Sequence, residues 1–400
     1  MSCRSRLRSV ALCVGAGFAV ALSLTEALWL QGRFFPTTPL VDWLPAINEP
    51  LDRWIWYLMI AAAMALAVLP WRRAAAAAGA VLYFGYSLWD QQRWIPFFNE
   101  VGALLLVLAI HRGRSEKEAR EALDDCGIVI ALIYVWSGLQ KLNYWFYVKV
   151  FPWMVGAFTP HLPEPVAQWL LGCAVLVPFI EALTGFALLT LRWRRIGMWS
   201  AIAMHAFILL CVGPLGLGGN VQVWFWNVAS AALVYLIFES SPTPLQEMLA
   251  LRARPLRAAL MAFFGIAPIL NFVVLPGIGR WDDFQAATLY SGNESQGKVY
   301  MTPQLALRLP EPLHDLFERD ADGQVRLDLK DWAYYELNVP DYHAQRVHEN
   351  AARRLCQYLG NPDGLVLRAG SKSDAFTGER RILERRCRDL TPVVAAPRAR

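Results

Sequence analysis

Long apolar runs follow one another from Val10 to Pro276, separated by short polar or basic segments. A run of about 18 or more residues with few charges can cross a bilayer as a helix. The pattern predicts about nine transmembrane helices, of which the second to fourth are the shortest. They are expected near residues 10–30, 54–70, 74–89, 95–111, 127–142, 166–191, 196–218, 219–238 and 257–275.

From about Gly277 the pattern becomes that of a soluble domain with mixed strands and helices. The predicted elements are strand pairs at 287–290 with 298–302 and at 325–329 with 332–339, a short helix at 312–319, a longer helix at 341–359 that ends at Gly360, and strands at 365–368 and 381–383. The expected fold class is an all-α polytopic membrane bundle with a small C-terminal α+β extracytoplasmic domain. Its parts are a transmembrane domain (1–276), the α+β domain (277–390) and a disordered tail (391–400).

Composition and charge agree with this organisation. Hydrophobic residues make up 56% of the chain and charged residues 18%, which argues against a soluble multidomain protein of this length. Fifteen basic residues fall in one alternate set of loops and five in the other, so the positive-inside rule places the N-terminus in the cytoplasm and the α+β domain outside. The Ala- and Arg-rich composition indicates a bacterial inner membrane with a periplasmic domain. No nucleic-acid-binding motif is present, and the first helix is interpreted as a retained anchor, with a cleaved signal peptide as the alternative.

Two motifs in the soluble domain leave alternatives open. Cys356 and Cys387 form a disulfide in an oxidising compartment or stay as free thiols. Residues 318–323 begin like a calcium loop, but Leu329 stands where the closing glutamate belongs. The segment is therefore predicted to be an Asp-Gly turn between strands, and no metal site is expected.

Ionisable residues inside apolar helices are costly, so they mark candidate sites. Lys141 shares one helix face with Tyr134 and Ser137, although it could instead reach the outer headgroups. Glu181 and His205 lie at similar depth on consecutive helices and are expected to approach each other, either as part of a site or as a pair that only locks two helices.

Further polar and aromatic residues lie in the outer half of the predicted bundle. Asn99, Glu100 and Asn227 are expected to line a polar cavity that opens outward, together with Asp90, Asn220 and Asn271 near helix ends. Trp145 belongs to an aromatic segment that either guides an amphiphile toward Lys141 or simply anchors the chain at the interface.

Three segments resemble the vitamin-K-dependent gamma-carboxylase-like family, also called the horizontally transferred transmembrane (HTTM) domain family. They are residues 137–143 (SGLQKLN) followed by Trp145, the histidine-bearing helix around 204–206 with the region 213–227, and 97–99 (FFN). The resemblance covers roughly residues 10–240. It implies a reduced, vitamin K-like quinone as cofactor, with Lys141 as the base acting on it. Beside it, Glu181, His205 and Glu100 are expected to be further catalytic residues, and Tyr134, Ser137, Asn99, Asn227 and Trp145 are the expected cofactor contacts. Burial favours the neutral amine of a lysine, which can take a phenolic proton.

This chain departs from the family at two points. Glu100 stands where the family often carries a catalytic histidine, and the exported domain is far smaller than the lumenal part of the carboxylase. Carboxylation of peptides is therefore a weaker expectation than quinol binding or other chemistry on a small or lipid-like substrate.

Three functions remain open at this stage. The first is a quinol-dependent membrane enzyme, the second a non-catalytic quinone- or lipid-binding subunit similar to DoxX-like proteins, and the third a transporter. No inverted repeat supports the third. The expected partners are membrane lipids or a quinone, and an extracytoplasmic substrate bound through the C-terminal domain, but no nucleic acid.

Overall fold

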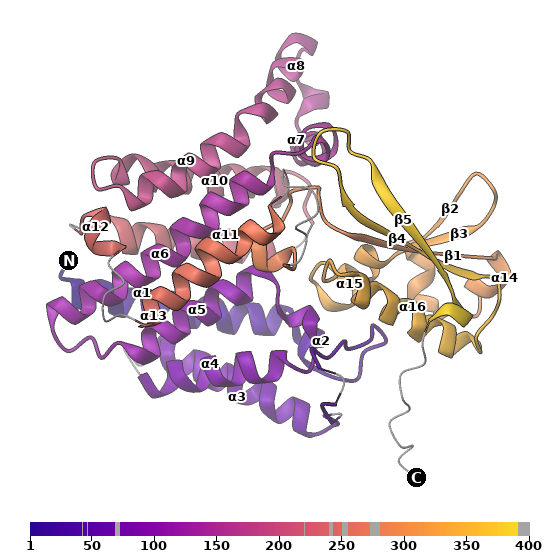
Figure 1. The fold of residues 1–400 in the computed structure, drawn as a ribbon, viewed down its shortest axis with the longest axis horizontal. Helices are drawn as coiled ribbons and strands as arrows, with labels where there is room; N and C mark the ends of the chain where they lie inside the picture. Colours follow the sequence, from indigo (N-terminus) through magenta and orange to yellow (C-terminus); the bar gives the residue numbers. More distant parts are fainter. Residues whose placement is uncertain are drawn as a thin grey trace.

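The chain folds into a helical bundle followed by an antiparallel sheet flanked by helices (Figure 1). The computed structural model describes residues 1–41, 43–45, 47–68, 73–219, 221–239, 243–249, 255–272 and 281–390. The helices of the first 272 residues are α1 (Cys3–Leu24), α2 (Glu26–Trp29), α3 (Leu51–Val68), α4 (Arg73–Ser87), α5 (Pro96–Ile110), α6 (Glu116–Gln140), α7 (Phe151–Val155), α8 (Glu164–Gly172), α9 (Val177–Leu189), α10 (Arg194–Val212), α11 (Val221–Phe238), α12 (Leu245–Met248) and α13 (Pro255–Met261).

Five helices in the described part of the chain are long and apolar enough to cross a membrane: α1, α3, α6, α10 and α11. A sixth span is present if α8 and α9, which are bent by 49° at their junction, count as one. These helices indicate a membrane protein, but they do not confirm all nine predicted spans. The other three predicted spans fall on α4 and α5, with 15 residues each, and on the irregular segment that begins with α13. Fifteen helical residues reach about 22 Å, which is less than the roughly 30 Å of the hydrocarbon core.

Local chemistry explains where two apolar runs break. The Thr25 hydroxyl donates to the carbonyl of Ala21 at 2.7 Å, and α1 ends there instead of continuing to residue 30. Pro178 stands in the first turn of α9, directly after the bend that separates α8 from α9. The hydropathy pattern alone could not show either break, because apolar residues continue on both sides.

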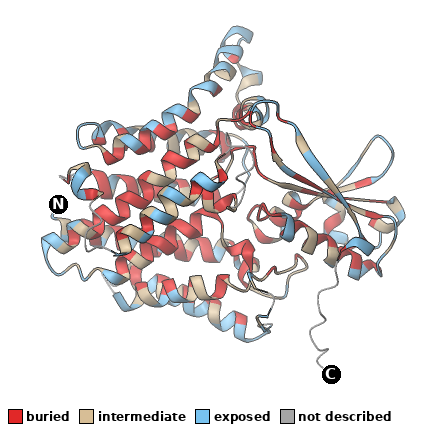
Figure 2. Ribbon diagram, in the orientation of Figure 1, coloured by how far each residue is buried: buried red, intermediate tan, exposed pale blue. Residues whose placement is uncertain are grey.

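Helix α6 lies at the centre of the bundle and contacts α1, α5, α9, α11 and α13. Its buried residues occupy every face over much of its length, whereas α9 and α10 each expose one side (Figure 2). An apolar helix face that the protein leaves uncovered is the surface expected to face lipid. The inner helix therefore carries the residues most enclosed by protein.

The C-terminal part contains a five-stranded antiparallel sheet of order β2-β3-β1-β4-β5. Helices α15 and α16 contact β1, and α15 also contacts β3 while α16 contacts β4. Cys356 of α16 is disulfide-bonded to Cys387, just after β5. The elements are β1 (Gln296–Met301), α14 (Pro303–Ala306), β2 (Phe317–Arg319), β3 (Val325–Asp328), α15 (Leu329–Leu337), α16 (Gln345–Leu359), β4 (Leu365–Ser373) and β5 (Arg380–Arg386).

The predicted helix at 341–359, the strands at 365–368 and 381–383 and the Asp-Gly turn between β2 and β3 are confirmed. Three other predictions are wrong. Residues 287–290 are not a strand, and β1 pairs instead with β3 and β4. Residues 332–339 lie mostly in α15, whose start is capped when the Asp328 carboxylate accepts the N–H of Lys330 at 3.1 Å. Where a helix at 312–319 was expected, the chain forms a 3₁₀ helix (Glu311–Leu316) that is followed directly by β2. The domain boundary near 277 and the tail 391–400 lie outside the described residues.

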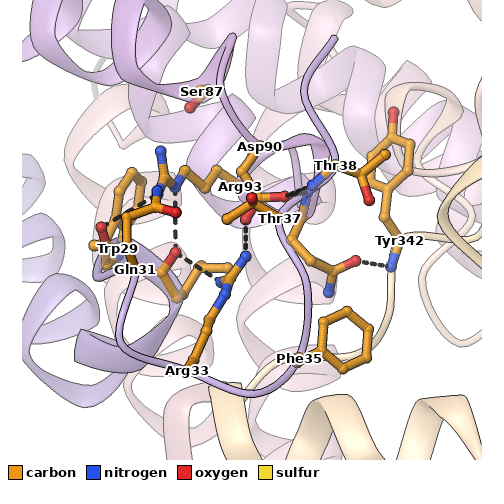
Figure 3. Close-up of polar contacts among 12 residues, drawn as sticks. Trp29, Gln31, Arg33, Phe35, Thr37, Thr38, Ser87, Asp90, Arg93 and Tyr342 are labelled. Atoms are coloured by element: carbon orange, nitrogen blue, oxygen red, sulfur yellow. Dashed lines mark hydrogen bonds and ion pairs between the residues drawn. The ribbon is translucent and has the colours of Figure 1, made fainter. Parts of the chain in front are cut away.

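A polar junction joins the bundle to the C-terminal part (Figure 3). Arg33 pairs with Asp90, whose other oxygen accepts the N–H of Thr38 at 3.1 Å, so Asp90 organises this junction and caps the turn 91–93. Arg93 is fully buried and stacks on Tyr86 at 3.7 Å.

The C-terminal part contributes four hydrogen bonds to this junction. The Glu336 carboxylate accepts the backbone N–H groups of Phe34 and Phe35. The backbone N–H of Tyr342 donates to the Gln92 side chain, and the Asn350 side chain donates to the Thr37 carbonyl. These contacts hold the two parts in a fixed relation.

Candidate functional site

Lys141 directly follows α6, and its amine is buried inside the protein. Nζ lies 2.8 Å from Oε2 of Glu181 and donates to Oγ of Ser137 at 2.7 Å and to the Ser137 carbonyl at 3.1 Å. Lys141 is 7% exposed and Glu181 8%. The amine therefore does not extend to the headgroups, and the alternative in which Lys141 snorkels to the surface is wrong.

Two glycines bring the backbones of α6 and α9 into contact. A Cβ at Gly138 would lie 2.4 Å from the backbone nitrogen of Ala182, and one at Gly185 would lie 2.5 Å from the carbonyl oxygen of Ala131. Small residues allow membrane helices to approach this closely. Because the two helices are so close, the Glu181 carboxylate lies near enough for the Lys141 amine to contact it.

His205 belongs to a second polar group on the same side of the bundle. The Tyr134 hydroxyl lies 2.5 Å from Nε2 of His205, and Nδ1 of His205 lies 2.8 Å from Oδ1 of Asn227. Asn227 Nδ2 donates to the Val223 carbonyl at 2.7 Å, which fixes its oxygen toward His205. A neutral imidazole with its proton on Nδ1 satisfies both contacts.

The expected direct contact between Glu181 and His205 is not formed. The Thr184 and Ser200 hydroxyls lie 2.7 Å apart and fix the register of α9 against α10. In that register Glu181 points toward α6, and its carboxylate forms an ion pair with Lys141. The imidazole is instead held by α6 and α11, through Tyr134 and Asn227.

These side chains surround a cavity of about 130 Å³, here called the Lys141 cavity. An apolar cavity of about 150 Å³ holds one benzene ring, so this one is of the size of a single aromatic ring. Its polar lining consists of Glu100, Tyr134, Ser137, Lys141, Glu181, His205, Asn227 and Ser230. Its other lining residues, nearly all apolar, are Pro96, Ile130, Ile133, Phe146, Phe151, Met154, Val177, Met204, Phe207, Ile208, Val223, Trp226, Ala287, Leu289 and Tyr290. Most of the wall is therefore hydrophobic, with polar groups at a few fixed points.

Two predicted site residues lie elsewhere. Asn99 accepts a hydrogen bond from the Tyr83 hydroxyl at 2.9 Å and donates to the Trp94 carbonyl, so it joins α4 to α5. Glu100, one position further and about 100° around the helix, faces the cavity, which Trp226 also lines. Trp145 donates its indole N–H to the Gly378 carbonyl at 2.8 Å and anchors the C-terminal part instead of lining the cavity.

The residues proposed at the ends of the helices are also separate from the cavity. Asn271 donates to Asp283 at 2.9 Å and accepts from Lys372. Asp90 serves the polar junction described above. Asn220 lies outside the described residues. The cavity is consequently more apolar than the sequence led us to expect.

A loop from the C-terminal part closes one side of the cavity. Ala287 and Tyr290 line it, and both have left-handed backbones, with φ of 57° and 54°. Tyr290 stacks on Trp153, with ring centroids 6.0 Å apart. Asn143 Nδ2, two residues after Lys141, donates to the Ser291 carbonyl at 2.9 Å. This contribution was missed because the apolar letters at 287–290 resemble a strand, and no local signal indicates that they contact the bundle.

Comparisons with known proteins add no family. No protein-family model matches the chain, and no significant match was found among curated proteins or among solved structures. The resemblance described above therefore rests on its own residues, and the chemistry must be argued from the cavity.

Proposed function

We propose that this chain is an integral membrane protein that binds the ring of a reduced quinone, or of a similar amphiphile, in the Lys141 cavity. Lys141 is proposed to act there as the base for oxidative or carboxylation-type chemistry. One observation carries the proposal: a buried amine, paired with a buried carboxylate, faces a mainly apolar cavity of the size of an aromatic ring. Ligand sites commonly combine such apolar walls with a few convergent polar groups.

Glu181 is proposed to assist Lys141 in the proton transfer. Only a neutral amine can take a proton from the ligand, so any proton on Lys141 must leave before it acts as a base. Nζ and Oε2 are 2.8 Å apart, which allows that proton to pass to Glu181. The neutral amine can then take the proton of a quinol hydroxyl, within the reach required of a general base.

His205 is proposed to orient the ligand. Tyr134 and Asn227 hold both nitrogens of its ring, so its position is fixed before the ligand arrives. A preorganised polar group beside an apolar wall can select one orientation of a ring that carries hydroxyl groups. Glu100 adds a second carboxyl group to the cavity wall.

A second candidate function is a non-catalytic quinone- or lipid-binding subunit. The observation that favours it is that Lys141 is already neutralised by Glu181 and bonded to Ser137. A fully satisfied amine can serve as a fixed wall of a binding site without performing chemistry. The experiment must therefore separate binding from turnover.

The proposed orientation has the N-terminus in the cytoplasm and the C-terminal part in a periplasm or outside the cell. The excess of basic residues in one set of loops supports it. The disulfide between Cys356 and Cys387 supports an oxidising compartment for the C-terminal part. In this orientation the loop at 287–290 would close the cavity from the outer side, where a soluble substrate could bind.

The test is to purify the full chain in mild detergent, extract its bound lipids, and measure quinone content and quinol-dependent oxygen uptake. The variants are Lys141→Ala and Lys141→Arg, with Lys149→Ala as the matched control, because Lys149 is an exposed lysine nearby that does not line the cavity. We expect wild type and Lys149→Ala to retain quinone and consume oxygen. Both Lys141 variants should lose turnover, since arginine cannot release its proton.

The outcomes distinguish the two functions. Retained quinone without oxygen uptake in wild type supports the binding subunit. Full turnover in Lys141→Arg rules out the base role and leaves only electrostatic stabilisation by a cation. Absence of any quinone, together with no saturable binding of an added naphthoquinone, overturns both candidates.

A further inference from the structure

Five arginines line a hollow that includes the first residues of α1. The N-terminus lies at the end of the bundle opposite the sheet (Figure 1). The hollow has a volume of about 360 Å³. Its basic side chains come from three separate segments: the start of α1, the start of α4 and the loop between α5 and α6. The complete lining is Arg4, Leu7, Arg8, Arg73, Ala74, Arg112, Gly113 and Arg114, and we call it the arginine hollow.

The arginines of the hollow form no ion pair within the part of the chain that the structure describes, since none of their five guanidinium groups has a carboxylate within 4.0 Å there. Two acidic residues of the first turn of α6 are engaged by backbone groups. Glu116 accepts the N–H of Cys3 at 2.7 Å, and Glu118 accepts the N–H of Arg114 at 2.9 Å. Like charges this close repel one another, so the arrangement favours an anion between them.

One arginine is held in place by the fold. Arg73 donates from Nε to the Ala109 carbonyl at 2.8 Å and from a terminal nitrogen to the Ile110 carbonyl at 3.3 Å, at the C-terminal end of α5. The guanidinium fork matches the oxygens of a phosphoryl group, to which it can donate two parallel hydrogen bonds. A phosphoryl anion is therefore the ligand chemistry that this set of side chains fits best.

We infer that the arginine hollow binds the phosphoryl headgroup of an anionic lipid. The lining also includes the apolar residues Leu7 and Ala74, which an acyl-bearing ligand can contact and a free phosphate does not need. The hollow also lies where α1 and α4 begin and α5 ends, at the expected level of lipid headgroups. Basic pockets between membrane helices on the cytoplasmic side are a known mode of binding anionic lipids. The inference is independent of the chemistry at Lys141.

Native mass spectrometry of the delipidated full chain in detergent can test this inference. Phosphatidylglycerol, phosphatidylcholine and inorganic phosphate are added separately. We expect wild type to retain phosphatidylglycerol in preference to phosphatidylcholine. The triple variant Arg8→Gln/Arg112→Gln/Arg114→Gln should bind it about tenfold or more weakly, since each lost charge-assisted contact weakens binding.

The control is Arg192→Gln/Arg195→Gln, which removes two exposed basic residues outside the hollow, one in the turn before α10 and one in the first turn of α10. It should leave the affinity unchanged. Equal weakening in the control and the triple variant, or no preference for the anionic lipid, overturns the inference. Displacement of the lipid by inorganic phosphate alone would overturn the lipid as the ligand and identify a soluble phosphate instead. If the triple variant does not fold, Arg112→Gln alone must reduce the affinity without changing the thermal unfolding temperature.

Discussion

Two buried ion pairs in the helical bundle have similar chemistry but different surroundings. Asp125 of α6 accepts from Nε of Arg257 at 2.5 Å and lies 2.8 Å from His111, and Arg257 is fully buried. The other pair, Lys141 with Glu181, lies beyond the opposite end of α6 and lines a cavity. Neither Asp125 nor Arg257 lines the Lys141 cavity or the arginine hollow.

The difference indicates which buried charge is structural. Asp125 and Arg257 are both buried and bonded to protein groups, so that pair is expected to lock α6 to α13. Lys141 and Glu181 can exchange partners with a ligand or with water, because one side of the pair is open. A buried ion pair is weak evidence of function by itself, and the adjoining cavity is what distinguishes this one.

The largest effect is expected at the enclosed pair. Arg257→Met should lower the free energy of unfolding by about 3–5 kcal/mol, because it leaves the Asp125 carboxylate buried without its main partner. The double variant Asp125→Leu/Arg257→Met should recover most of that loss, since it removes both charges. Unfolding in mild detergent, followed by tryptophan fluorescence, measures both. A double variant no more stable than Arg257→Met would show that the pair does more than neutralise charge.

A smaller loss of stability is expected at the open pair. Lys141→Met should lower the free energy of unfolding by about 1–3 kcal/mol, because water in the cavity can solvate the remaining Glu181 carboxylate. Binding of an added naphthoquinone should nevertheless weaken about tenfold or more. If Lys141→Met destabilises the protein as much as Arg257→Met does, the proposed contrast between the two pairs is incorrect.

The loop that closes the cavity gives a third test. At Gly292, φ is +82° and a Cβ would lie 2.9–3.1 Å from Val150, Trp145 and Phe146. Gly292→Ala should destabilise the loop by about 1–2 kcal/mol and speed ligand release. Gly323→Ala is the matched control, because Gly323 has φ of +77° but open space around it and lies in the β2–β3 turn. Equal release rates in the two variants would mean that the loop does not retain the ligand.

The smallest effect concerns a buried titratable group in the C-terminal part. Neither ring nitrogen of His343 has a hydrogen-bond partner in the described structure, and the nearest carboxylate, that of Asp341, is 3.9 Å away. Burial lowers the pKa of His343, partly offset by Asp341, Glu294 and Asp283. As the pH falls below about 6.5, His343 becomes protonated in the unfolded chain before it does so in the folded protein. Protonation therefore favours the unfolded chain, and the free energy of unfolding decreases in that range.

The free energy of unfolding should therefore fall as the pH is lowered from about 7 to about 5. His343→Phe, which keeps a ring beside Phe284, should flatten the dependence of the unfolding temperature on pH over this range. His348→Phe is a useful contrast, because it removes the 2.6 Å contact with Asp341 and should destabilise at every pH. An unchanged pH slope in His343→Phe would assign the acid sensitivity to another group.

The sequence predicted the elements whose signals are local. Apolar runs located the helices, and helical spacing placed Tyr134, Ser137 and Lys141 on one face, which the structure confirms. The helix α15 was missed although Asp328 provides a cap and Trp332, Ala333 and Leu337 share its buried face. The aromatic residues of this segment favour a strand, whereas the capping residue Asp328 favours a helix, and the helix is what forms.

The parts that could not be predicted depend on contacts between distant segments. Nothing near Glu181 in the sequence shows that its carboxylate pairs with Lys141, forty residues earlier, and not with His205. Gly138 and Gly185 permit that contact, but glycines in membrane helices are too common to identify it alone. The closing loop, from Ala287 to Tyr290, lines the same cavity as α6 and α11, and only the folding of the whole chain brings these distant segments together.

The central claim, that the Lys141 cavity holds a quinone ring, is tested most directly by photoaffinity labelling in native membranes. An azido-naphthoquinone is photolysed on the full-length protein, and the labelled peptides are mapped by mass spectrometry. The account predicts adducts on cavity residues such as Tyr134, Met204 and Trp226, with labelling that excess unlabelled naphthoquinone prevents. Adducts confined to lipid-facing residues such as Trp54 or Phe186, unaffected by competitor, would contradict it.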